Sequence, residues 1–193
     1  MLRAVRRNAI ASVRGGGGSG LGANATGQDS ERGWRARYPE FRARARGTNV
    51  NERTLLATDY LNHVNEIIML LELVPDAPEC LEDCRAWRPM SYVEHFQASS
   101  IADRDLAIAA YGFSPPEFRA SFDRLTAEMH RVIAGALASL EAAVAQGDEQ
   151  RARRVVELAV GALKTMVDQA SSTIHGDVQI MDQAAIDGLM DMM

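Results

Sequence analysis

The sequence predicts an all-α fold, a three- or four-helix bundle built on a long antiparallel helical hairpin and preceded by a disordered N-terminal arm. Residues that lose little side-chain freedom in a helix (Ala, Leu, Met, Glu and Arg) are abundant, whereas aromatic residues make up only 6% of the chain. Apolar residues recur at helical spacing over long stretches. The sequence has neither the sustained apolar and polar alternation of strands nor an Asn-Gly hairpin signal.

Residues 1–48 are predicted to form a disordered basic arm. A run of glycines at 15–18 favours flexibility, because glycine loses the most entropy on ordering. Ten arginines against three acidic residues give residues 1–50 a net charge of +7, whereas the whole chain carries −5. A basic arm on an acidic body indicates a partner with an acidic surface. Residues 1–28 contain no acidic residue, which fits an organelle transit peptide or a plain disordered tail.

Arginines surround three regularly spaced aromatic residues within this arm. On a helix the aromatic residues would form one face flanked by cations, which suits an acidic groove on a partner protein. The same residues could stack on single-stranded nucleic acid, the less favoured interpretation. Pro39 argues against one continuous helix here. The predicted protein-docking residues are Trp34, Arg35, Tyr38, Phe41 and Arg42.

The predicted bundle occupies residues 49–177. Asn51 is a plausible N-cap for its first helix, 52–74, which ends at Pro75. Three short helices should follow. Two of them begin with capping-box spacing, Ser91 with Glu94 and Ser100 with Asp103. The expected ranges of the short helices are 79–87, 91–98 and 101–111.

Two long amphipathic helices complete the predicted bundle. The segment 114–117, Ser-Pro-Pro-Glu, predicts a helix start that leads to about Gln146. Gly147 and Asp148 form a turn, and the next helix extends to about residue 175, where Gly176 ends it. A short connection between two long helices predicts an antiparallel hairpin.

The densest polar cluster lies on the helix 52–74 and consists of Asp59, Asn62, His63 and Glu66. At 100° per residue the four side chains fall within about 100° of one another. The apolar face of that helix, centred near Val64, is more than about 100° from this cluster around the helix axis. A solvated polar stripe is the default interpretation of such a pattern.

The same stripe also allows a metal site. Asp59, His63 and Glu66 could ligate one ion, with a histidine from another helix (His95, His130 or His175) completing the shell. These ligands resemble those of ferritin-like and hemerythrin-like bundles, which implies iron, manganese or zinc. The repeated Glu-x-x-His pair of those families is absent from the sequence. We therefore expect no metal cofactor and keep the metal-binding bundle as an alternative.

Asp59-x-x-Asn62 resembles the acid-x-x-amide pattern of phosphatases that act on response-regulator receiver domains. In those proteins the amide orients the attacking water, and the acid contacts the receiver's lysine or its magnesium environment. The resemblance implies that Asp59 and Asn62 are catalytic residues. The chemotaxis phosphatase CheZ instead spaces an acid and a glutamine four residues apart, where this chain has Asp59 and His63.

Residues 178–193 are predicted to be a short helix or docking peptide. The segment 180–190, IMDQAAIDGLM, resembles the peptide with which flagellar motor-switch proteins dock CheY, and CheZ ends in a related segment. A short amphipathic helix of this kind lies in a groove on its partner. Gly188 departs from the usual pattern and weakens the free helix by about 1 kcal/mol. The alternative is a terminal helix that packs on its own bundle. The matching residues are Gln183, Ile186, Asp187 and Leu189.

These observations favour a cytoplasmic, non-catalytic regulatory or adaptor protein that acts through protein–protein contacts. A receiver domain is the most specific expected partner, and its dephosphorylation is the one activity the motifs imply. The rival interpretations are the metal-binding bundle and an accessory protein tethered by its basic arm to a large acidic assembly. The hairpin also permits a homodimer. No apolar run is long enough to span a bilayer, and Cys80 and Cys84 are too few for a disulfide framework.

Overall fold

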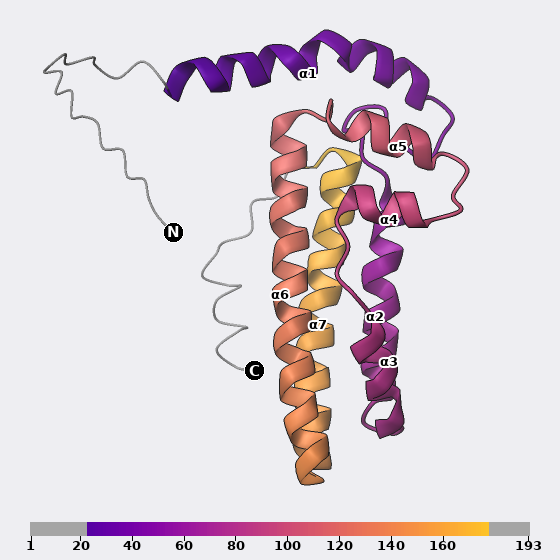
Figure 1. Cartoon of the computed structure of the whole chain (residues 1–193), viewed down its shortest axis with the longest axis vertical. Coiled ribbons are helices and arrows are strands. Elements are labelled where there is room, and N and C mark those ends of the chain that lie inside the picture. Colours follow the sequence, from indigo (N-terminus) through magenta and orange to yellow (C-terminus); the bar gives the residue numbers. More distant parts are fainter. Residues whose placement is uncertain (1–22, 178–193) are drawn as a thin grey trace, which may run out of the picture.

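The computed structural model of the chain describes residues 23–177, with side chains from residue 33 onward (Figure 1). The described residues form seven α-helices and no strand, which confirms the all-α prediction. The two longest helices, α6 (Pro116–Gln146) and α7 (Glu149–His175), lie side by side and form the spine of the bundle. The remaining helices are α1 (Ala23–Ala45), α2 (Leu61–Leu73), α3 (Leu81–Ala86), α4 (Tyr92–Ala98) and α5 (Arg104–Tyr111).

The turn between α6 and α7 confirms the predicted hairpin. Gly147 ends α6 with a φ of 65°, a left-handed conformation that glycine adopts without strain. The backbone N–H of Asp148 donates to the Ala143 carbonyl at 2.9 Å. The Asp148 side chain then caps α7 by accepting from the Arg151 N–H at 2.9 Å. A two-residue connection therefore reverses the chain and makes the helices antiparallel.

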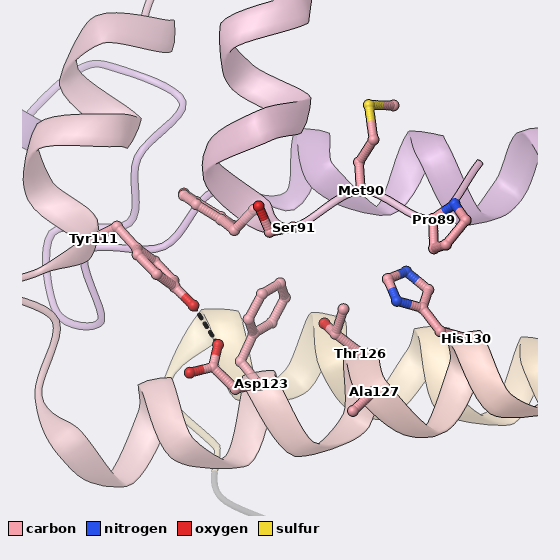
Figure 2. A pocket seen from close by; sticks show the side chains of 10 residues that line it. Pro89, Met90, Ser91, Tyr111, Asp123, Thr126, Ala127 and His130 are labelled. Atoms are coloured by element: carbon pink, nitrogen blue, oxygen red, sulfur yellow. Dashed lines mark hydrogen bonds between the residues drawn. The ribbon is translucent and has the colours of Figure 1, made fainter. Parts of the chain in front are cut away.

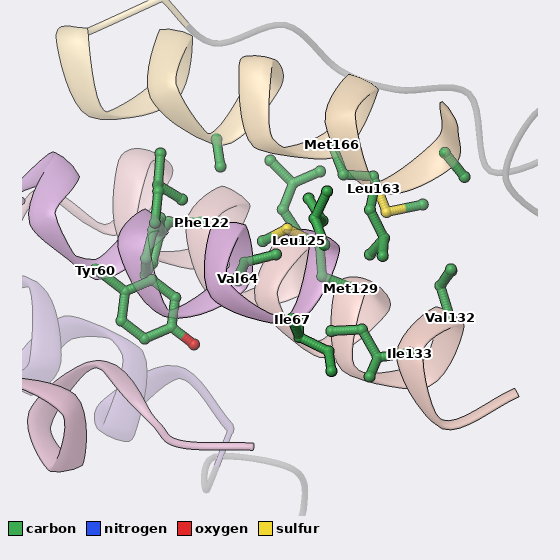
Figure 3. Close-up of a cluster of buried hydrophobic side chains, with 14 of the residues drawn as sticks. Tyr60, Val64, Ile67, Phe122, Leu125, Met129, Val132, Ile133, Leu163 and Met166 are labelled. Carbon is green, nitrogen blue, oxygen red and sulfur yellow. The ribbon is translucent and has the colours of Figure 1, made fainter. Parts of the chain in front are cut away.

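Helix α2 packs against α7 and completes the core. Two ion pairs connect this region to α7 at 2.7 Å each: Lys164 with Glu72 of α2, and Arg153 with Asp76 just after α2. Between the three helices lies a continuous set of buried apolar side chains (Figure 3). The set includes Tyr60, Val64, Ile67, Phe122, Leu125, Met129, Val132, Ile133, Leu163 and Met166.

The start of α2 differs from the prediction that this helix begins at residue 52. Instead, the Asn51 side chain accepts hydrogen bonds from the N–H groups of Arg53 (2.9 Å) and Thr54 (3.0 Å), which holds a turn. Leu55 follows with a φ of 58°. A short 3-10 helix, Thr58–Tyr60, then leads into α2. The Asn51 side chain thus makes the hydrogen bonds of an N-cap, as predicted. The helical turn that it opens ends at once, because the left-handed conformation of Leu55 cannot continue a right-handed helix.

The N-terminal arm also differs from the prediction, since α1 covers part of the segment 1–48 that was expected to be disordered. Pro39 lies inside α1, where it removes one helical hydrogen bond without ending the helix. The last turns of α1 bury Phe41 and Ala45 against the body, and the Phe41 ring stacks on Phe113 at 4.8 Å. The Tyr38 hydroxyl donates to the Arg53 carbonyl at 2.8 Å. These contacts stabilise the helix; residues 1–22 lie outside the described part.

The short helices match the predicted positions, with one cap confirmed and one corrected. Ser91 and Glu94 form the capping box of α4: the Ser91 N–H donates to the Glu94 carboxylate at 2.8 Å. Asp103, predicted to pair with Ser100, is instead the N-cap position of α5 without capping it. Its carboxylate accepts from the Asn49 N–H at 3.0 Å and so ties α5 to the segment after α1.

Truncating the hairpin core should destabilise the whole domain. Leu163 is fully buried between the long helices, so Leu163→Ala should lower the free energy of unfolding by about 2–5 kcal/mol through lost burial and a residual cavity. Exposed Thr165, half a turn away, is the matched control, and Thr165→Ala should change stability by less than about 0.5 kcal/mol. Urea denaturation followed by circular dichroism measures both. Equal effects would contradict the assigned packing of α7.

Candidate functional site

Asp59 and Asn62 lie where the 3-10 turn meets the first turn of α2, and both are accessible to solvent. They line a depression of about 430 Å³ whose other wall belongs to α7. Its polar lining contains two carboxylates and two side-chain amides but no basic side chain: Thr58, Asp59, Asn62, Asn65, Asp168 and Ser171. Asp59 is half-buried and Asn62 is exposed, so both side chains can contact a partner.

His63 does not belong to that solvated stripe, contrary to the sequence interpretation. Its side chain is 3% exposed and its ring stacks on Trp87 with centroids 4.6 Å apart. Its Nε2–H donates to the Arg88 carbonyl at 2.9 Å, and the Trp87 indole N–H donates to the His63 carbonyl at 3.1 Å. These contacts tie α2 to the segment after α3. Glu66, 62% exposed, stays outside with its carboxylate 3.9 Å from His63 Nδ1.

Three of the four histidines gather with Tyr60 and Trp87 in one cluster. The His63 and His95 rings are 5.8 Å apart, and Tyr60 lies edge-on to His95 at 5.5 Å. The Tyr60 hydroxyl donates to the Met90 carbonyl at 2.8 Å and lies 3.5 Å from His130 Nε2. His175 is elsewhere, at the end of α7, where its Nδ1 contacts the Ser171 carbonyl at 2.7 Å.

Burial keeps this cluster neutral. Desolvation lowers the pKa of His63, His95 and His130 below the ordinary value of 6.5. Mutual repulsion adds to this effect, since a charge on His95 lowers the pKa of His63 and a charge on His63 lowers that of His130. Asp59 and Glu66 oppose the shift at His95. Desolvation also raises the pKa of the Tyr60 hydroxyl to about 12.

The predicted metal ligands do not converge. Asp59, His63 and Glu66 do not form a site for one ion, and no other three His, Cys, Asp or Glu side chains among the described residues do so either. The His63 ring is engaged by Arg88 and Trp87, whereas Asp59 opens onto the depression beside α7. Their spacing places the three side chains on one side of the helix, which suggested a shared ion. The spacing does not show that the His63 ring turns toward the interior.

A second depression, of about 330 Å³, lies beside the histidine cluster under the segment 89–91 (Figure 2). The Tyr111 hydroxyl donates to the Asp123 carboxylate across one end, and His130 closes the other end. Met90 also lines two neighbouring depressions that reach His63, His95 and Glu66. Met90 is thus part of the wall of all three depressions beside the histidine cluster.

Sequence reasoning missed this second depression. Its residues come from α4, α5, α6 and the segment before α4, and only the tertiary fold brings them together. A signal was present at two of the three histidines, since Tyr60 precedes His63 by three positions and Phe96 follows His95. The spacing of these aromatic residues predicts that the two histidines are buried, but it does not predict the shape of the second depression.

The predicted docking residues of the arm are divided by the structure. Phe41 is 1% exposed and belongs to the core, so it is not free to dock. Trp34 and Tyr38 are half-buried and contact each other edge to face at 5.6 Å. Arg35 and Arg42 are exposed. The second predicted docking set, Gln183, Ile186, Asp187 and Leu189, lies outside the described residues.

Comparisons with protein-family models, with curated proteins and with solved structures found no match. None of the helices in the range 23–177 is long and apolar enough to cross a membrane.

The neutral histidine cluster should make stability depend on pH. Because the folded pKa values are lowered, the folded protein binds fewer protons than the unfolded chain below the ordinary value of 6.5. The free energy of unfolding should therefore be highest near neutral pH and fall as pH decreases from about 7 to about 5. Urea denaturation at several pH values measures the slope.

His130→Gln should make that slope shallower, because one group that resists protonation is removed. Exposed His175 is the matched control, and His175→Gln should keep the slope of the parent protein. If the free energy of unfolding of the parent protein does not change between about pH 7 and about pH 5.5, the histidine cluster is not neutral in the way proposed here.

Proposed function

We propose that this chain is a helical regulatory protein that binds the phosphorylated receiver domain of a response regulator and promotes loss of its phosphoryl group. The observation that carries the proposal is that half-buried Asp59 and exposed Asn62 line one depression together with Asp168. Residues three apart on a helical turn are neighbours, so the carboxylate and the amide reach the same partner group. The absence of basic side chains from that lining suits a partner that presents cations.

The chemistry needs little from the chain beyond position and charge. The Asn62 amide orients a water molecule toward the phosphorus of the receiver's phosphoaspartate. The Asp59 carboxylate pairs with the receiver's lysine or its magnesium environment and fixes the approach. Water forms the new oxygen–phosphorus bond as the bond from phosphorus to the aspartate oxygen breaks. The products are inorganic phosphate and a free aspartate carboxylate, and one proton passes to solvent.

A second contact is the segment 180–190, whose resemblance to peptides that dock CheY suggests that it binds the same receiver. This segment follows the end of α7, and the depression with Asp59 is lined by Ser171 from the last turns of α7. Ser171 lies four residues before the end of α7, which is about 6 Å along the helix. A receiver held by the segment would therefore be close to Asn62.

The test uses the intact protein and each receiver domain encoded in the same genome, phosphorylated with a small phosphodonor. Loss of the phosphoryl group is followed by phosphate release, and binding by fluorescence anisotropy. At least one receiver should bind and lose its phosphoryl group faster in the presence of the protein. Asn62→Ala should reduce the acceleration by about 10²-fold or more because one positioned group is lost, yet leave binding unchanged.

Two further variants separate the contacts. Ile186→Asp with Leu189→Asp in the full chain should weaken binding by about 10-fold or more, since a hydrophobic anchor is lost. Asn65→Ala, in the same depression but not in the acid-x-x-amide pattern, is the matched control for Asn62→Ala and should keep most of the acceleration. If no receiver binds the intact protein, the proposed function is wrong.

A further inference from the structure

The depression of about 330 Å³ under the segment 89–91 has aromatic walls (Figure 2). The rings of Tyr92 and Tyr111 stack with their centroids 4.6 Å apart. The Phe122 ring stands perpendicular to the Tyr92 ring, with the centroids 5.6 Å apart. The segment 89–91 adds further apolar surface across from α6. This volume lies at the lower end of the range for small-molecule sites, whose linings are also rich in aromatic side chains.

Asp123 on α6 is the only acidic residue of this lining, which contains no lysine or arginine. The Tyr111 hydroxyl donates to its carboxylate and fixes the position of the group. A carboxylate has about four acceptor positions, so most of them remain for a ligand. The Arg119 guanidinium, one turn earlier on α6, donates to the Gly112 carbonyl at 3.2 Å and is held at the end of α5. The depression therefore offers a ligand acceptors and one negative charge.

His130 closes the other end of the depression without adding a positive charge (Figure 2). Desolvation lowers the pKa of its imidazole, so the ring is neutral near pH 7. A neutral imidazole and a carboxylate leave the lining with a net negative charge. Such a lining repels anions and attracts cations.

We propose that this depression binds a small organic cation that carries one ammonium group on an apolar body. The ammonium group pairs with the Asp123 carboxylate and lies against the Tyr111 ring, because aromatic rings attract cations. The apolar body extends toward Met90 and His130. A phosphate or carboxylate ligand would meet Asp123 with no lysine or arginine in the lining to offset the repulsion, so anions are the wrong class.

This site is separate from the depression that contains Asp59, since the two share no lining residue. Tyr60 lies between them: it follows Asp59 in the chain, and its hydroxyl is 3.5 Å from His130 Nε2. Binding of a cation beside Asp123 does not depend on the proposed function. Either proposal can therefore fail without the other.

Benzylammonium, which joins one ammonium group to one aromatic ring, is the probe that tests the proposal. Benzyl alcohol is the neutral probe of similar shape, and benzoate is the anionic one. Benzylammonium should bind the full chain saturably, with a dissociation constant on the order of 1 mM, as expected for a ligand of this size. The other two should bind at least about 10-fold more weakly. Lack of saturable binding, or equal binding of benzyl alcohol, would overturn the proposal.

Proton NMR of the histidine rings follows the titration and locates the site. The chain has four histidines, and comparison with His130→Gln assigns the His130 signals. At constant pH, benzylammonium should shift the His130 signals. The signals of His175, at the end of α7, are the control and should stay in place. Shifts of equal size at both histidines, or shifts at His175 alone, would place the probe elsewhere and contradict the proposed site.

Asp123→Asn tests the charge, because it keeps an acceptor for the Tyr111 hydroxyl. It should weaken benzylammonium binding by about 10-fold or more and leave binding of benzyl alcohol unchanged. The matched control is Glu117→Gln, at an exposed acidic residue in the first turn of α6 that does not line the depression. This control should bind benzylammonium as the parent protein does. Unchanged binding in Asp123→Asn would show that the carboxylate is not the cation site.

Ala127→Leu tests the space instead of the charge. Ala127 is exposed and lines the depression, so a larger side chain can fill part of it without disturbing the core. Binding of benzylammonium should fall by about 10-fold or more, because the probe and the new side chain compete for the same volume. Circular dichroism checks that each variant is folded. If folded Ala127→Leu binds the probe as tightly as the parent protein, the ligand does not occupy this depression.

Discussion

Close packing of α6 on α7 is the contact on which the rest of the molecule depends. Both helices bury small side chains along their seam, including Ala136 and Ala143 on α6 and Ala159 and Ala170 on α7. Small residues let the two backbones approach, and larger ones such as Leu163 fill the space between them. The turn at Gly147 makes these contacts local in sequence, so the entropy of closing them is low. Helix α2 then has a preformed surface on which to dock.

The histidine cluster shows how the short helices are attached to this spine. His63 on α2, His95 on α4 and His130 on α6 meet around Tyr60 and Trp87. Tyr60 and His63 donate hydrogen bonds to the backbone carbonyls of Met90 and Arg88. Neutral imidazoles can both donate and accept in a partly buried setting without the cost of a buried charge. The cluster therefore holds an irregular segment in place, and the pH dependence follows from that structural role.

Local sequence signals predicted most helices and turns well. The features that these signals missed depend on contacts between parts of the chain that are distant in sequence. The Gly147 turn and the capping box at Ser91 each depend on neighbours within a few residues, so the pattern alone predicts them. Helix α1 was missed because its stability comes from Phe113, far along the chain. The outward direction of Asp59 and Asn62 followed from helical periodicity, whereas their neighbour Asp168 depends on the register of α2 on α7, which periodicity does not contain.

Helix α7 connects the depression to the segment that follows it in the chain. Asp168 lines the depression with Asp59, and α7 ends at His175. A receiver bound to residues 183–190 would be tethered to Asp177 by a linker of five residues, which spans at most about 17 Å. Ser171, in the wall of the depression, lies only about 6 Å along the helix from the end of α7. A short tether that can span the sites gives an effective concentration in the millimolar range. If the proposed function holds, weak complementarity at Asp59 and Asn62 would then suffice, because docking of the segment would supply the affinity and the depression only the geometry.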